Sequence, residues 1–212
     1  TIGHGLGIAP KMIIGKNTNF VDNWHVYHSA ISPATEVRLN STSAATTTTW
    51  QSASTSSVFQ IKNGSWTNGG QVCLFYCFAE IPGYSSIGSF TGNGSTDGPF
   101  VYTGFTPRYV LFKRTNAAES WPILDTARGS SFGADAGTGG DNPTAANDLN
   151  SVLVASTNAA EEDNASGSRK ASFNSNGFKV RTTNTAMNGS GSTYIYMAFA
   201  ENPFGGDGVA PA

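Results

Sequence analysis

Charged residues are scarce in this sequence of 212 amino acids. Asp, Glu, Lys and Arg make up 12 % of the chain, about half the usual share, and the formal net charge is −2. Such a composition provides no basic surface for nucleic acid or for an anionic membrane. The solvent-facing residues must therefore be mainly Ser, Thr, Asn and Gly, and the 13 Phe residues can supply a core.

Long apolar runs and cysteines are also scarce. No run approaches the roughly 18 apolar residues of a membrane-spanning helix, and no signal-peptide pattern is visible, so we expect no membrane insertion. The two cysteines, Cys73 and Cys77, lie in a predicted strand at a spacing of about 13 Å, beyond disulfide reach. We expect two buried free thiols, because no further Cys or His lies nearby to complete a metal site.

One apolar stretch occurs twice, at residues 73–82 (CLFYCFAEIP) and 194–203 (YIYMAFAENP). Both versions are rich in strand-forming residues, and both contain Phe-Ala-Glu, one further residue and then Pro. We predict that each forms a strand buried on both faces, at the centre of its own half of the molecule. The self-similarity predicts two homologous repeats.

Other segments match between the two halves. Three pairs of equivalent positions are Pro10 with Pro107, Trp24 with Trp121, and Glu80 with Glu201. The offset is 97 (107 − 10) at the prolines and 121 (201 − 80) at the glutamates. The increase arises mainly at residues 128–147, which lack an apolar period and are predicted to be an inserted surface loop. The tryptophans are predicted to pack in the core or between sheets, and the glutamates to accept hydrogen bonds at strand ends.

The remaining pattern predicts an all-β protein with little or no helix. Alternating apolar segments, separated by Gly, Asn and Ser, predict strands at residues 11–16, 24–28, 36–40, 58–62 and 86–91. We predict two tandem β-sandwich repeats of jelly-roll type, covering residues 1–84 and 85–204, followed by a tail at 205–212.

The strand at residues 86–91 is predicted to lead the second repeat, and the first repeat shows no counterpart before Thr1. One hypothesis is that the missing strand lies upstream in a precursor or comes from a neighbouring subunit by strand addition. It predicts that residues 86–91 or 205–212 pair across a subunit boundary. The alternative is that the domain simply begins at Thr1.

Candidate binding residues are few. Trp50 and Trp66 lie in polar segments and have no counterparts in the second half, so they are candidates for stacking on sugar rings, or for subunit contacts. Asp135, Asp141 and Asn142 have the oxygen ligands of a calcium loop without the EF-hand spacing, and a flexible surface loop is the alternative.

Residues suited to catalysis do not form a recognisable set. His4, His25 and His28 have no metal-binding partners at matching repeat positions, and no serine lies in a Gly-x-Ser-x-Gly turn. Glycosidases need two carboxylates in one cleft, whereas duplication places Glu80 and Glu201 in separate halves. We therefore predict no catalytic residue, no cofactor and no enzymatic activity.

Several segments resemble a duplicated domain common in tailed bacteriophages, notably those of aquatic hosts. They are residues 3–14 (GHGLGIAPKMII), 88–94 (GSFTGNG), 97–105 (DGPFVYTGF), 125–128 (DTAR), 176–181 (NGFKVR) and 199–204 (FAENPF). The chain departs from this resemblance at Gly15, where an aliphatic residue is usual, and in its abrupt start.

The resemblance implies a virion structural protein, such as an external fibre, tail or head-decoration module. It implies a place on the virion surface, assembly in the host cytoplasm, and homo-oligomeric contacts or contacts with other virion proteins. One alternative is a receptor-binding module that recognises host surface carbohydrate, with Trp50 and Trp66 exposed in one groove. A second alternative, a polysaccharide-degrading enzyme, lacks a converging acidic pair.

Overall fold

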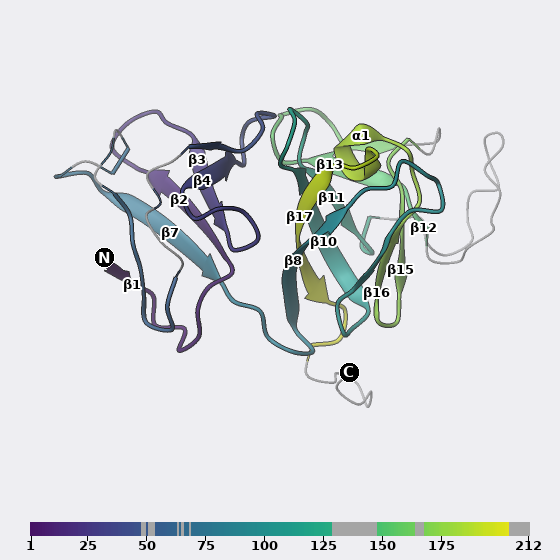
Figure 1. Ribbon diagram of the computed structural model, residues 1–212, viewed down its shortest axis with the longest axis horizontal. Coiled ribbons are helices and arrows are strands. Elements are labelled where there is room, and N and C mark those ends of the chain that lie inside the picture. The colour runs from purple at the N-terminus through teal and green to yellow at the C-terminus, as the bar shows by residue number, and fades with distance from the viewer. Residues whose placement is uncertain are drawn as a thin grey trace.

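The computed structural model describes residues 1–47, 50, 54–62, 64, 66–67, 69–128, 148–163 and 168–203. Its regular structure is almost entirely antiparallel strand, which confirms the all-β prediction (Figure 1). The one helix in these ranges, α1 (Thr185–Asn188), is a single turn. Within the same ranges, no helix has the length and apolar character needed to cross a membrane.

The strands fall into two groups along the chain. The first half contains β1 (Ile2–Gly3), β2 (Met12–Asn17), β3 (Trp24–His28), β4 (Thr35–Arg38), β5 (Thr46–Thr47), β6 (Val58–Phe59) and β7 (Cys73–Phe78). The second half contains β8 (Ser85–Thr91), β9 (Phe100–Tyr102), β10 (Pro107–Arg114), β11 (Pro122–Asp125), β12 (Asp148–Leu149), β13 (Ser151–Val154), β14 (Glu162–Asp163), β15 (Ala171–Asn174), β16 (Gly177–Val180) and β17 (Thr193–Ala200).

Each half contains one large and one small sheet. The large sheet of the first half has the order β5-β4-β3-β2-β7, and that of the second half has the order β14-β13-β11-β10-β17-β8. The small sheets are β1-β6 and β12-β15-β16-β9. Met12 of β2 pairs with Phe78 of β7, and Tyr109 of β10 pairs with Phe199 of β17. The pairing of β2 with β7 therefore has the same register as that of β10 with β17, at the sequence offsets of 97 and 121. The two orders agree position by position, except that β7 has no neighbour corresponding to β8. Homology between the halves remains a prediction.

Three apolar clusters lie between these sheets. An outer core in each half separates its large and small sheets, and a central core lies between the two large sheets. Figure 1 shows this layering, from β1 at the left to β15 and β16 at the right. On β2, Ile13 enters the outer core while Met12 and Ile14 enter the central core. Inner strands are therefore buried on both faces.

Polar groups also join the two halves. The Lys113 side chain is fully buried, and its Nζ donates hydrogen bonds to the carbonyl oxygens of Thr42 and Glu119. Burial lowers the pKa of Lys113 to about 8. His28 Nε2 lies 3.2 Å from the carbonyl oxygen of Tyr196 in the other half. These contacts fix the two large sheets against each other.

The two apolar stretches that dominate the sequence have different environments. The stretch at β17 is buried on both faces between β10 and β8, as predicted. The same prediction for β7 is wrong, because β7 is the last strand of its sheet. Leu74 and Tyr76 are consequently 45 % and 46 % exposed.

Gly15 explains how the first outer core is filled. A Cβ atom at this position would lie 2.8 Å from the Trp66 ring and 2.9 Å from the Phe75 ring. The equivalent position in the second half carries Phe112, which lies in the other outer core. The space that a side chain at Gly15 would occupy is thus taken by Trp66 and Phe75.

Gly15→Ala should lower the free energy of unfolding by roughly 1–3 kcal/mol, because the added methyl group overpacks a closed aromatic core. Urea denaturation followed by circular dichroism measures the change. Gly69→Ala is the matched control, since a Cβ there would meet no atom within 4 Å. Equal stability of the two variants would show that the core around Gly15 is not tightly packed.

Candidate functional site at the edge of β7

The outer edge of β7 carries no strand in the described part of the chain. Thr18 N donates to Val72 O, which directs the backbone groups of residue 72 toward β2. Backbone groups alternate in direction along a strand, so those of Cys73, Phe75 and Cys77 point away from β2. The strand has no Pro and no charged residue, the features that commonly protect sheet edges from pairing with other chains.

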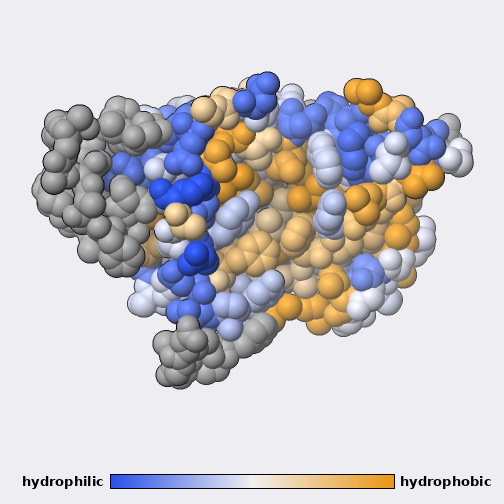
Figure 2. Space-filling model, turned by 180° about the vertical axis from the view of Figure 1, so that it is seen from behind, coloured by the Kyte–Doolittle hydropathy of each residue, from blue (hydrophilic) through white to orange (hydrophobic). Residues whose placement is uncertain are grey.

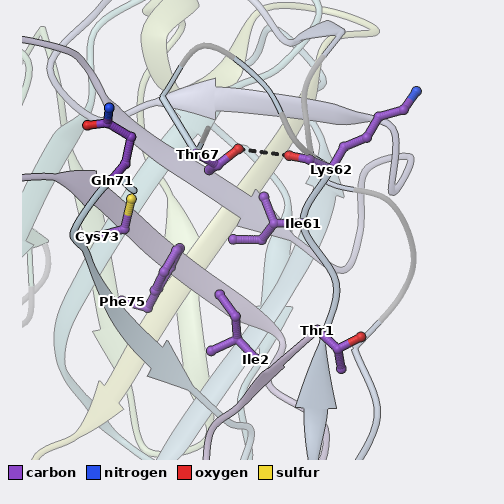
Figure 3. Close-up of a pocket in the computed structure, with 8 residues that line it drawn as sticks. All are labelled: Thr1, Ile2, Ile61, Lys62, Thr67, Gln71, Cys73 and Phe75. Atoms are coloured by element: carbon purple, nitrogen blue, oxygen red, sulfur yellow. Dashed lines mark hydrogen bonds between the residues drawn. The ribbon is translucent and has the colours of Figure 1, made fainter. Parts of the chain in front are cut away.

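A cavity of about 360 Å³ lies beside this edge (Figure 3). Ile2, Ile61 and Phe75 form its apolar wall, and their side chains point toward one another. Polar residues border it, and Thr67 Oγ1 donates a 2.8 Å hydrogen bond to the carbonyl oxygen of Lys62. The site therefore combines unpaired backbone groups with an adjacent apolar hollow.

The two cysteines of β7 are free thiols, as the strand spacing predicts. They are partly rather than fully buried, because the edge of the sheet is open. Burial raises the pKa of both thiols, and the nearby negative charge of Asp22 raises that of Cys73 further. Both side chains are therefore protonated at neutral pH and are weak nucleophiles.

The exposure expected for Trp50 and Trp66 is wrong. Their side chains are 3 % and 2 % exposed, and they pack with Tyr27, Phe59 and Phe75 in the outer core of the first half. The Trp50 and Trp66 rings cover part of the large sheet that the short strands β1 and β6 do not cover alone. Because protein atoms cover the rings, these residues cannot stack on a sugar from solvent.

The repeat-related tryptophans and prolines have packing roles. Trp121 lies in the central core, and its Nε1 donates a 2.8 Å hydrogen bond to the carbonyl oxygen of Arg38. Trp24 is partly buried against the same core. Pro10 is buried just before β2, and Pro107 is buried at the start of β10.

The repeat-related glutamates do not meet in one cleft. Glu201 Oε1 accepts a hydrogen bond from Arg108 Nη1 at 3.2 Å, at the end of β17. Glu80 is exposed and borders a separate hollow of about 340 Å³, next to Tyr102. No second carboxylate appears among the described residues that line this hollow.

The three histidines make separate contacts. His25 Nδ1 lies 2.8 Å from Glu36 Oε1 in the core, and the His25 ring stacks on Trp66 at 4.1 Å. His4 Nε2 lies 3.0 Å from the carbonyl oxygen of Thr55. Burial lowers the pKa of His28 to about 4.

Metal-binding residues do not gather in the described ranges, where no three His, Cys, Asp or Glu side chains form a group suited to a metal ion. The candidate calcium ligands Asp135, Asp141 and Asn142 lie outside those ranges, as do the inserted loop from residue 129 to residue 147 and the C-terminal tail.

The fold defines an all-β protein of packed antiparallel sheets, in which the terminal strand β7 has an open edge among the residues that the structure describes. The family model described as "Domain of unknown function (DUF7483)" matches residues 1–203. The chain therefore belongs to the DUF7483 family. Neither a curated protein nor a solved structure matches it.

Proposed function

We propose that this protein is a non-enzymatic structural subunit of a tailed-phage virion. It lies on the outside of the particle, as part of a fibre, a tail or a head decoration, and it self-assembles. The sequence resemblance to duplicated virion domains supports the phage assignment. The unprotected edge of β7 supports assembly, because such an edge pairs readily with another chain.

The character of the surface agrees with repeated contacts between subunits. With 12 % charged residues, contacts can form through backbone pairing and neutral hydrogen bonds. Figure 2 shows a broad apolar area on the face turned away in Figure 1, over the first half of the chain. Exposed large apolar residues include Leu6, Ile8, Phe20, Val21, Val72, Leu74 and Tyr76. Contiguous apolar surface of this kind is typical of interaction sites.

Two of the polar residues considered for chemistry, His25 and Glu201, have structural partners. The buried Glu36 contacts His25 and Arg38, and Glu201 contacts Arg108. We therefore propose no catalytic role for these residues. We also propose no carbohydrate site at Trp50 and Trp66, because both rings are buried.

Assembly should be directly measurable. We expect oligomers or ordered filaments of the purified protein, by light scattering and by electron microscopy of the same sample. Tyr76→Lys should raise the protein concentration needed for assembly at least tenfold, because it places a charge on the apolar edge strand β7. The control is Leu153→Lys, since Leu153 is a partly exposed apolar residue on β13 in the second half of the chain. A wild-type monomer at every concentration tested would contradict the proposal.

A further inference from the structure

We propose that β7 accepts one additional antiparallel strand from a neighbouring molecule, and that an aromatic side chain of this donor strand fills the adjacent cavity. The inference rests on the strand order and the cavity, and it does not depend on the virion role. It identifies the open edge as an acceptor site and specifies the chemistry of its partner.

The pairing of β8 with β17 provides the template. Gly92 N donates to Ser192 O, and Ala200 N donates to Tyr84 O, so alternate residues of β17 direct their backbone groups toward β8. Those residues are Tyr194, Tyr196 and Ala198. At an offset of 121 they correspond to Cys73, Phe75 and Cys77, the residues whose backbone groups point outward from β7.

Phe90 of β8 shows what occupies the corresponding space in the second half. Its ring stacks on Tyr194 at 5.1 Å and contacts Phe178 at 6.1 Å. Tyr194 corresponds to Cys73, which lines the cavity beside β7.

The other walls of the cavity correspond in the same way. Ile61 matches Val180 at an offset of 119 (180 − 61). Ile2 pairs with Phe59 as Val101 pairs with Phe178. The cavity thus lies where the Phe90 ring lies in the second half. At about 360 Å³ it has room for a phenyl ring, since a protein cavity of about 150 Å³ can bind benzene.

The opposite face of β8 specifies a second donor residue. Ile87 is 3 % exposed and packs in the central core with Ile195 and Met197. These two residues correspond to Leu74 and Tyr76, which are half-exposed on β7. An aliphatic donor residue at the position of Ile87 would cover them.

The position between these two must be small. A Cβ atom at Gly88 would lie 3.0 Å from the Tyr196 hydroxyl oxygen, and Tyr196 corresponds to Phe75 on β7. The partner is therefore an uncharged strand with an aliphatic residue, a small residue, any residue and an aromatic residue in succession, as in residues 87–90 (IGSF).

The β8 strand of a second copy does not meet this requirement. Its Phe90 is already packed in the second outer core, so it could pair with β7 only edge to edge and would leave the cavity empty. The donor is a separate strand with the same residue pattern, carried by another subunit.

A synthetic peptide with the sequence of residues 84–92 (YSSIGSFTG) tests the proposal. Fluorescence anisotropy with a dye-labelled peptide should show saturable binding to the full chain. The matched control is the same peptide with Phe90→Ser, which should bind at least tenfold more weakly. Equal binding of the two peptides would show that no aromatic side chain enters the cavity and would overturn the proposal, as would the absence of binding.

Disulfide exchange tests the register. In the template Phe90 lies opposite Tyr194 and Ser86 lies opposite Ala198, positions that correspond to Cys73 and Cys77. Opposed residues of this kind have Cα atoms about 5.5 Å apart, within disulfide range. A peptide with Phe90→Cys, activated as its pyridyl disulfide, should therefore label Cys73. The peptide with Ser86→Cys should label Cys77.

Cys73→Ser and Cys77→Ser variants, with peptide mapping by mass spectrometry, distinguish these products. Each variant should lose labelling by one peptide and retain labelling by the other. Labelling of either cysteine by both peptides would reject the register and the proposal. Register-specific labelling of a protein that is a monomer alone would support the acceptor edge and reject self-assembly of this chain, so the two proposals can fail separately.

Discussion

Trp66→Ala should lower the free energy of unfolding by about 3–5 kcal/mol, the range for truncation of a large buried aromatic residue. Trp66 is 2 % exposed, stacks on His25 and packs against Phe75 across the space left by Gly15. Its removal leaves a cavity among His25, Trp50 and Phe75, which the surrounding core closes only in part. Urea denaturation with circular dichroism detection measures the loss.

Tyr102→Ala is the matched control for this substitution. Tyr102 is 69 % exposed on β9, so its truncation should change the free energy of unfolding by no more than about 0.5 kcal/mol. If Trp66→Ala left stability unchanged but removed binding to a glycan array, the packing assignment would be wrong. Trp66 would then be a ligand-binding residue.

The protein should lose about 3 kcal/mol of stability through His28 as the pH falls from 6.5 to 4. His28 accepts a hydrogen bond from Ala30 N at Nδ1, and Nε2 can donate to Tyr196 O, so the neutral ring fits its contacts. Burial, aided by the charge of Lys11, lowers its folded-state pKa to about 4, while the unfolded chain keeps a value near 6.5. Between these values the unfolded state binds more protons, so acid favours unfolding.

His28→Gln isolates this contribution, because carboxylate titration is common to both proteins. Urea denaturation at several values between pH 7 and pH 4 should show a smaller loss for the variant, by about 3 kcal/mol at the acid end. Parallel stability profiles of the two proteins against pH would contradict the prediction. They would show that His28 has the same pKa in the folded and the unfolded chain.

Periodicity in the sequence predicts many of the strands. The segments at 11–16, 24–28 and 86–91 correspond to β2, β3 and β8, because side-chain alternation and turn residues are local signals. The two apolar stretches also form strands. The position of β7 at an edge depends on whether another strand pairs with it, and that is a property of the whole sheet. The hypothesis of a missing leading strand stays a prediction, and among the described residues β7 has no neighbour that corresponds to β8.

The candidate site was harder to predict. Trp50 and Trp66 lie among Thr, Ser, Asn and Gly, a local pattern that predicts exposure. The burial of Trp66 depends on Gly15, which is far away in the sequence and whose missing side chain leaves room for the Trp66 ring. Gly15 departs from the aliphatic residue that is usual in the resembling domains, and this departure indicates that a bulky residue elsewhere in the half fills the space. No local sequence pattern predicts the cavity beside β7, because its walls come from segments that are far apart in the chain.

The central core makes the two halves of residues 1–203 depend on each other for folding. Met12, Ile14 and Val26 of the first half share that core with Leu111 and Ile195 of the second. Either half alone would present a wide apolar sheet face to water, as a bisected domain does. The two halves must therefore be inherited, and grafted into any engineered scaffold, together. Substitutions on the core-facing side of one large sheet are therefore limited by the shape of the facing large sheet.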